Sequence, residues 1–324
     1  MSKRRACLSV IFLVLCATAL YLPRSEAQPS TVKQIVPGVW FREGELLDQG
    51  HCNNVIIEMQ DSLIVVDANF PSGARLALAD AKKVSAKPVR LVFDTHHHGD
   101  HAYGNAVWTK LGAVTLAHAG VAQEMKRVEP QRWQETAKQR KDMAELNLAT
   151  AEPPQKTFDR SPHVVSDSTR RVEFHFFGWA HTRGDGFVYL PKERLICTGD
   201  AAVNGPFNFL GDANIGNWAN VLAGAQKLDV QHVLPGHGPA GGREILAAQR
   251  QFFVELTKVA GAAVAQGKKL EDLVTLKDGR VVATSVTLPD AVKTYVGRSF
   301  PGQVRDAFEE ARQKKPRGDL DLTR

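Results

Sequence analysis

Short apolar runs alternate with helix-like stretches through the first third of the chain. Apolar runs bounded by glycine or by polar turns are typical of buried strands. They fall at residues 39–41, 54–58, 63–66, 89–93 and 114–117. Residues 72–85, with Ser72 as the predicted N-cap, and residues 105–111 have the spacing of helices. This alternation predicts an α/β fold with right-handed crossover connections.

The same two patterns return after residue 170. Further strands are expected at residues 171–177, 187–190, 194–198 and 230–234. Helices are expected at residues 217–228 and 243–265, and residues 289–314 are expected to be mostly helical with a break at Pro301-Gly302. Two α/β halves with helices outside each sheet predict a four-layer αββα sandwich.

Between the two halves, residues 119–160 are polar and helix-favouring, with Pro130, Pro153 and Pro154 as breaks. We interpret them as two helices inserted between core strands. They lie close enough in sequence to the histidine-rich motif at residues 96–101 to form a cover over it. The alternative is a solvent-exposed helical segment without a functional role. The predicted organisation is therefore one domain over residues 28–324, with this insertion and a helical C-terminal extension over residues 243–324.

Residues 1–27 have the features of a secretory signal. A basic start at residues 3–5 precedes an apolar core at residues 8–20, and Ser25-Glu26-Ala27 suits a cleavage site. Cleavage predicts a periplasmic or secreted protein without an integral membrane span in the mature chain, and an uncleaved anchor or a lipid on Cys16 are the alternatives. The formal net charge of +6 includes four basic residues and one acidic residue of this segment, which leaves +3. This mild, dispersed charge argues against nucleic acid as a partner.

Two cysteines, Cys52 and Cys197, follow the predicted cleavage site. Both lie beside apolar, strand-like runs, so buried thiols are expected. Export to an oxidising compartment would also permit a disulfide between them, and the sequence leaves both alternatives open.

The strongest chemical signal is the run from Thr95 to His101, which holds four imidazoles and one carboxylate in six consecutive positions. Protonation near neutral pH would set these imidazoles against one another, whereas a divalent metal binds their neutral form. In the pattern H-x-H-x-D-H the potential ligands are His96, His98, Asp100 and His101. The run directly follows an expected buried strand, and such strand ends commonly carry the active sites of α/β proteins.

Three further donors each come just after a strand-like run: His181, Asp200 and His237. With these motifs, in this order, the chain resembles the metallo-β-lactamase superfamily over roughly residues 36–240. The matching motifs are H-x-H-x-D-H at 96–101, His181, Gly-Asp at 199–200, Pro-Gly-His-Gly at 235–238 and the acidic Asp67 after an early strand.

The resemblance implies two metal ions. His96, His98 and His181 would bind the first, Asp100, His101 and His237 the second, and Asp200 would bridge them. Imidazole and carboxylate donors without a thiolate suit two Zn²⁺ ions per chain, with iron and manganese as alternatives. Two such metals could hold a hydroxide and polarise a substrate carbonyl at the same time.

Other residues receive supporting roles. Asp100 is also the expected catalytic residue, which would orient the nucleophile and pass a proton to the leaving group. Asp67 is expected to accept hydrogen bonds from the histidine loop and so to orient the ligands. Candidate walls of a substrate pocket are Phe207, Phe209, Trp218 and His118. Core positions for the aromatic residues, and a simple strand end for His118, are the alternatives.

These features indicate an exported binuclear zinc hydrolase that cleaves an ester, thioester or lactam bond of a small molecule with a metal-bound hydroxide. Zinc β-lactamases commonly have Cys or Ser near the position of Asp200, so the chain resembles the thioesterase and lactonase branches more closely. A β-lactamase proper, an iron-binding redox protein and a non-catalytic accessory protein of the same fold are the alternatives. The substrate and the oligomeric state are not determined by the sequence.

Overall fold

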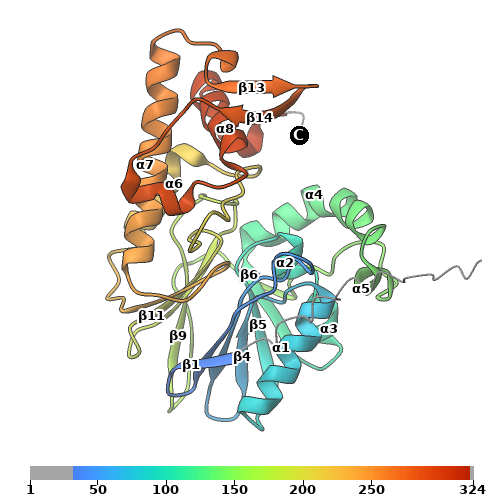
Figure 1. Ribbon diagram of the computed structural model, residues 1–324. Helices are drawn as coiled ribbons and strands as arrows, with labels where there is room; N and C mark the ends of the chain where they lie inside the picture. The colour runs from blue at the N-terminus through green and yellow to red at the C-terminus, as the bar shows by residue number, and fades with distance from the viewer. Residues whose placement is uncertain (1–31, 322–324) are drawn as a thin grey trace, which may run out of the picture.

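The computed structural model describes residues 32–321, and the segment interpreted as a signal peptide lies outside this range. Two sheets lie face to face in the lower part of Figure 1. The first sheet has seven strands in the order in which they occur along the chain. They are β1 (Val32–Val36), β2 (Val39–Arg42), β3 (Asn54–Glu58), β4 (Leu63–Val66), β5 (Val89–Asp94), β6 (Val114–His118) and β7 (Lys156–Phe158).

The second sheet has five strands in the order β12-β11-β10-β9-β8. Its strands are β8 (His163–Ser166), β9 (Arg171–Phe176), β10 (Gly186–Leu190), β11 (Leu195–Gly199) and β12 (His232–Pro235). The pairs β4–β5, β5–β6 and β11–β12 are parallel. Parallel neighbours bring their carboxyl ends to the same edge of a sheet, which is where functional loops gather.

Helices cover the outer faces of both sheets. On the first sheet these are α1 (Pro71–Val84), the one-turn α2 (Gly99–Ala102) and α3 (Asn105–Thr109); on the second they are α6 (Ile215–Ala225) and α7 (Glu244–Ala265). Between the sheets Phe93 packs against Phe174, with ring centroids 4.6 Å apart. Outside the second sheet Trp218 stacks on Phe253 at 3.9 Å. This arrangement is the predicted αββα sandwich.

The structure corrects several local predictions. Edge strands β1, β7 and β8 were not expected, because they are short or only half-buried and have weak apolar patterns. Helix α1 begins at Pro71, and the Ser72 hydroxyl donates to Asp142 instead of capping the helix. The expected break at Pro301-Gly302 is absent, because Pro301 lies in the first turn of α8 (Phe300–Gln313), where its missing N–H has no helical partner to lose.

The polar segment after β6 forms α4 (Ala119–Ala137) and α5 (Lys141–Ala144). The C-terminal region contains, besides α7 and α8, an unexpected hairpin of β13 (Val274–Lys277) and β14 (Arg280–Thr284) and the 3₁₀ turns η1 (Leu270–Asp272), η2 (Asp290–Tyr295) and η3 (Arg317–Asp319). No helix within residues 32–321 has the length and apolar character needed to span a bilayer.

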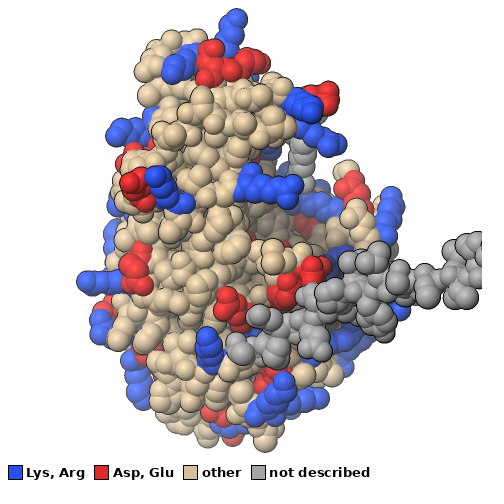
Figure 2. All heavy atoms as spheres, viewed as in Figure 1, with Lys and Arg blue, Asp and Glu red and all other residues tan. Residues whose placement is uncertain are grey.

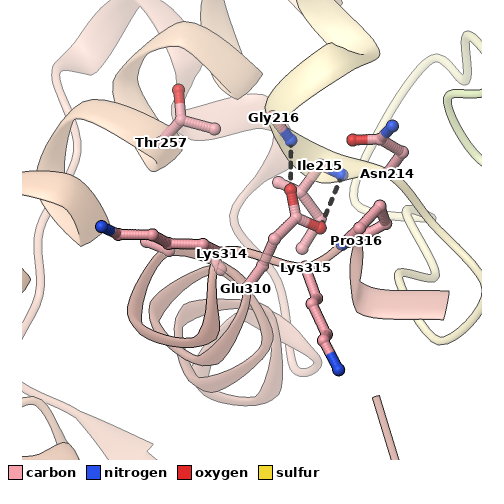
Figure 3. Close-up of a pocket in the computed structure, with 10 residues that line it drawn as sticks. Asn214, Ile215, Gly216, Thr257, Glu310, Lys314, Lys315 and Pro316 are labelled. Carbon is pink, nitrogen blue, oxygen red and sulfur yellow. Dashed lines mark hydrogen bonds between the residues drawn. The ribbon is translucent and has the colours of Figure 1, made fainter. Parts of the chain in front are cut away.

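Glu310 of α8 joins the C-terminal region to the rest of the molecule. Its carboxylate accepts the backbone N–H groups of Ile215 and Gly216 at 2.9 and 2.5 Å, at the start of α6 (Figure 3). A negative charge is favourable there because the first N–H groups of a helix have no partner within the helix. The carboxylate thus attaches α8 to α6, the helix that follows the loop after Asp200.

Candidate metal centre

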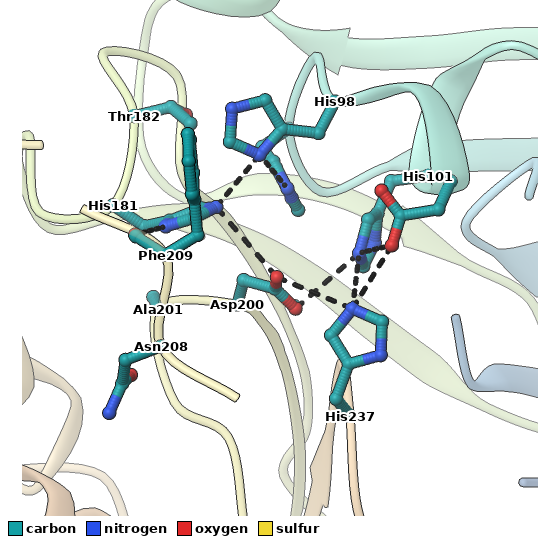
Figure 4. A network of polar contacts seen from close by, with 12 residues as sticks. His98, His101, His181, Thr182, Asp200, Ala201, Asn208, Phe209 and His237 are labelled. Atoms are coloured by element: carbon teal, nitrogen blue, oxygen red, sulfur yellow. Dashed lines mark hydrogen bonds and ion pairs between the residues drawn. The ribbon is translucent and has the colours of Figure 1, made fainter. Parts of the chain in front are cut away.

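Four segments from the two sheets deliver donor side chains to one place (Figure 4). The loop after β5 carries residues 96–101, the β9–β10 connection carries His181, and Asp200 and His237 follow β11 and β12. The last two strands approach each other so closely that a Cβ on Gly236 would lie 2.1 Å from Asp200 Oδ1. Glycine before His237 is therefore a steric requirement.

His96, His98 and His181 form the first cluster. His98 Nδ1 lies 3.1 Å from His96 Nε2 and 2.9 Å from His181 Nε2. The three side chains come from two segments that are 83 residues apart in the sequence. Their ring nitrogens lie within 4.8 Å of one another, which is close enough for the three side chains to bind one metal ion.

Asp100, His101 and His237 form the second cluster. His237 Nε2 lies 3.0 Å from Asp100 Oδ2 and 3.4 Å from His101 Nε2. Asp200 lies between the clusters, with Oδ2 3.4 Å from His237 Nε2 and 3.8 Å from His181 Nε2. Its position is that of a carboxylate able to bridge two cations.

The outer nitrogens of these rings show that the inner nitrogens carry lone pairs. His181 Nδ1 faces the Phe209 carbonyl at 3.0 Å, and His98 Nε2 faces the Asp212 carboxylate at 2.8 Å. Both partners are acceptors, so these ring nitrogens carry the protons. With both rings neutral, His181 Nε2 and His98 Nδ1 are then two lone pairs facing each other at 2.9 Å. A cation between them resolves this conflict, so the residues fit a metal site.

The second cluster also places a ring nitrogen against an acidic partner. In its neutral form His101 donates Nδ1–H to Asp67 Oδ2 at 2.8 Å, which leaves its Nε2 lone pair facing Asp200 Oδ1 at 3.4 Å. Asp200 Oδ1 is buried and has no hydrogen-bond donor. A buried carboxylate oxygen in this position requires positive charge beside it, which a metal ion or a proton on His101 would supply.

The two clusters differ in electrostatics. Burial lowers the pKa of His181 to about 3, and the neighbouring His98 adds to this effect. Burial also opposes protonation of His237, but the charge of Asp200 and contacts with Asp100 outweigh it and raise its pKa to about 9. The second cluster therefore attracts positive charge more strongly than the first.

Asp67 lies where the sequence predicted a supporting residue. Besides receiving His101 Nδ1–H, its other oxygen accepts the backbone N–H of Thr95 at 2.8 Å. Asp67 has a φ of 66°, a left-handed conformation that non-glycine residues rarely adopt. The carboxylate thus holds both the start of the histidine loop and one of its ligands.

A second supporting network was not predicted. Asp212, which orients His98, is held by Arg132 of α4 through two hydrogen bonds of 2.7 and 2.8 Å. The spacer His97 is fully buried beside them, with Arg132 Nη1 donating to its Nε2 at 3.3 Å. Asp212 and Arg132 are 80 residues apart and belong to no motif, so no pattern in the sequence pairs them.

A pocket of about 580 Å³ opens beside Asp100, Asp200 and His237. Phe207 and Phe209, two of the four candidate wall residues, line it. Trp218 and His118 do not: Trp218 is fully buried against Phe253, and His118 caps α4 and stacks on Phe176 at 3.8 Å. Helix α4 also contributes to the pocket wall, through Glu129, Arg132, Glu135 and Thr136.

Cys52 and Cys197 are both buried and free, so the structure has no disulfide between them. Burial raises the pKa of the Cys52 thiol to about 12. The thiol form, which is a poor metal ligand, is therefore strongly favoured.

The sequence model of the metallo-beta-lactamase superfamily matches residues 47–250. This range includes every predicted metal ligand and more than half of the chain.

Solved structures with a similar fold have low sequence identity. A metallo-beta-lactamase from Pontibacter korlensis is 19% identical with a TM-score of 0.57, and the match covers 69% of this chain and 99% of that one. A Pseudomonas aeruginosa metallo-beta-lactamase in a mono-zinc form is 24% identical with a TM-score of 0.56, covering 70% and 95%. One from Hirschia baltica is 23% identical with a TM-score of 0.55, covering 70% and 98%. At these identities the similarity shows a shared fold.

Proposed function

Because this chain belongs to the metallo-β-lactamase superfamily, we propose that it is a hydrolase that binds two zinc ions and cleaves an ester, thioester or lactam carbonyl bond. The observation that carries the proposal is the set of facing lone pairs, with His98 Nδ1 and His181 Nε2 2.9 Å apart. His96, His98 and His181 would hold one ion, Asp100, His101 and His237 the other, and Asp200 both.

Bound zinc would polarise the carbonyl and lower the pKa of a water molecule toward about 7, so that hydroxide is available at neutral pH. The protein's contribution is to fix the donors. Asp67 and Asp212 hold His101 and His98 each in one tautomer, with one lone pair directed inward.

Asp100 is the residue we assign to proton transfer. Its side chain remains 22% exposed and lines the pocket, whereas Asp200 is 8% exposed. Asp100 Oδ2, 3.0 Å from His237 Nε2, could orient a nucleophile and then donate a proton to the leaving group, because Asp100 is the more exposed of the two aspartates that line the pocket.

Metal analysis and a substrate panel test this function. The purified protein should contain two zinc ions per chain and hydrolyse at least one member of a panel of β-lactams, acyl thioesters, lactones and aryl esters. Iron with visible absorption would indicate a redox protein instead. Failure to retain any metal at micromolar concentration would favour an accessory protein.

We also propose that the protein acts after export, because residues 1–27 have the pattern of a cleavable signal. N-terminal sequencing of the protein recovered from a bacterial periplasm should begin at Gln28. An intact Met1 in the cytosolic fraction would contradict export and leave the chemistry untouched.

A further inference from the structure

The wall segment, residues 206–209, belongs to the pocket and also contacts a proposed metal ligand. All four of its residues line the pocket. The Phe209 ring is 45% exposed and lies 5.5 Å from the ring of His98. The backbone carbonyl of Phe209 accepts the Nδ1–H of His181 at 3.0 Å. The position of the wall segment therefore affects both the shape of the pocket and the orientation of His181.

Asn208 attaches the wall segment to two helices of the C-terminal region. Its Oδ1 accepts the Nε2–H of Gln249 in α7 at 2.5 Å, and its backbone carbonyl accepts the Nε2–H of Gln303 in α8 at 2.7 Å. The three residues are at most 4% exposed. In Figure 4 the Asn208 side chain points away from the donor cluster. Because a buried polar group is destabilising unless it is hydrogen-bonded, these contacts hold the wall segment in one place.

Other contacts place the C-terminal region beside the same segment. A Cβ on Gly297 would lie 2.5 Å from the Cβ of Pro206. Gln303 Nε2 also donates to the hydroxyl of Ser299, a pocket residue, at 3.2 Å. Figure 2 shows the hollow on this face below the C-terminal region, which is the uppermost part of the molecule in Figure 1. Helix α8 lies beyond residue 250, so it is outside the part of the chain that matches the superfamily model.

The three amides form a network that lowers stability. Asn208 Nδ2, Gln249 Oε1 and Gln303 Oε1 are buried and have no hydrogen-bond partner within residues 32–321. Apolar side chains of the same size would fill this space without leaving polar atoms unpaired. A network that holds a pocket segment at the expense of stability is typical of a functional site.

We propose that Gln249 and Gln303 are positioning residues, which place the wall segment through Asn208 and so determine how tightly the pocket binds the substrate group that lies against Phe209. The proposal rests on the hydrolase function above. It adds two residues that neither line the pocket nor belong to a metal-binding motif. Because neither side chain touches the reacting atoms, they act on KM more than on kcat.

Hydrogen exchange tests the attachment. Methionine removes the amide of glutamine and keeps a side chain of similar length and volume. Gln303→Met should increase exchange of the Asn204 and Phe207 amides about tenfold, because the segment loses a buried contact. Both amides donate to backbone carbonyls at 2.9 Å in the parent, and mass spectrometry of peptides from residues 201–210 measures their exchange. Gln249→Met should have the same effect, and it decides the question if Gln303→Met does not fold.

Kinetics with two esters measure the effect on the pocket. 4-Nitrophenyl phenylacetate carries a ring that can lie against Phe209, whereas 4-nitrophenyl acetate does not. In zinc-saturated Gln303→Met, KM for the phenylacetate ester should rise about fivefold with kcat within about twofold of the parent, and both constants for the acetate ester should stay within about twofold. A loss of correctly folded protein would instead lower kcat for both esters equally.

Gln313→Met is the matched control. It makes the same substitution in α8, at an exposed glutamine whose amide donates to Glu309 at 2.8 Å, and it should change neither exchange nor kinetics. Parent-like exchange in both Gln303→Met and Gln249→Met, or an equal rise in KM for the two esters, would overturn the proposal. The exchange measurement needs no turnover. Faster exchange without cleavage of either ester would therefore support the positioning role and count against the hydrolase alone.

Discussion

At the scale of single residues, Asp200 is the carboxylate on which the two donor clusters depend. It lies 3.4 Å from both His101 and His237 and 3.8 Å from His181. We expect Asp200→Ala to reduce zinc from two ions to about one per chain and to lower kcat/KM at least 100-fold. Elemental analysis and kinetics on the same preparation measure both. Asp229→Ala, at an exposed aspartate paired with Arg194, is the control; unchanged zinc content in Asp200→Ala would exclude a bridging role.

His51 predicts how stability responds to acid. Burial, together with the charges of Arg42 and Arg140, lowers its pKa to about 4, while its Nε2 hydrogen-bonds Ser72 at 2.8 Å. Between pH 6.5 and 4 the unfolded chain binds a proton at this site that the folded chain does not, so stability falls as the pH falls through this window.

Between pH 7 and pH 4.5, the free energy of unfolding should therefore fall by about 2–3 kcal/mol less in His51→Gln than in the parent protein. Urea denaturation at the two pH values measures this difference, and metal loss affects both proteins alike. His232→Gln, at a half-exposed histidine, is the matched control. Parallel pH profiles for His51→Gln and the parent would contradict the assignment.

At the scale of elements, α4 is connected to the proposed metal centre. Its Arg132 holds Asp212, which fixes His98. Arg132→Ala should weaken binding of the first zinc by about 10- to 100-fold, because a ligand that loses its orienting partner binds metal less well. Competition with a chromophoric chelator measures the affinity. Arg127→Ala removes an arginine of the same helix that pairs with Glu124, and it should change the affinity less than twofold.

Elements with strong periodic patterns could be predicted from the sequence, and those stabilised by their neighbours could not. Strands β3, β4 and β5 are apolar runs, so their positions were evident. The half-buried β1 and the hairpin β13–β14 have polar faces and form through pairing that no local pattern reveals. The candidate metal donors stand out in the sequence because they follow strands in recognisable motifs, whereas Arg132 is one of many charged residues on a polar helix.

At the scale of the whole molecule, the turn η3 near the C-terminus packs against the loop that contains Asp212. Gly318 donates its N–H to Ala213 at 2.8 Å, and a Cβ at this position would lie 2.6 Å from the Asp212 carbonyl and 2.9 Å from Trp179. Gly318→Ala should lower stability by about 1–3 kcal/mol through this overlap and should also weaken zinc binding. Thermal unfolding and chelator competition measure both effects.

The control is Gly302→Ala in α8, where an added Cβ meets no atom within 4 Å. Retention of full stability and zinc affinity in Gly318→Ala would show that the turn η3 shifts without moving Asp212.

The long-range packing of η3 against the loop that contains Asp212 could not be predicted from the sequence, and the same holds for the burial of Trp218. In the sequence, Phe209 and Trp218 are both aromatic residues that follow Asp200. Only the packing of the layers determines which of the two is exposed.

The free, buried state of Cys52 and Cys197 has a practical consequence. Residues 32–321 are stabilised by packing and, as proposed, by zinc, so their folding needs no oxidant and should tolerate dithiothreitol. Recombinant material from a reducing host should thus be as native as exported material, and peroxide should inactivate it slowly.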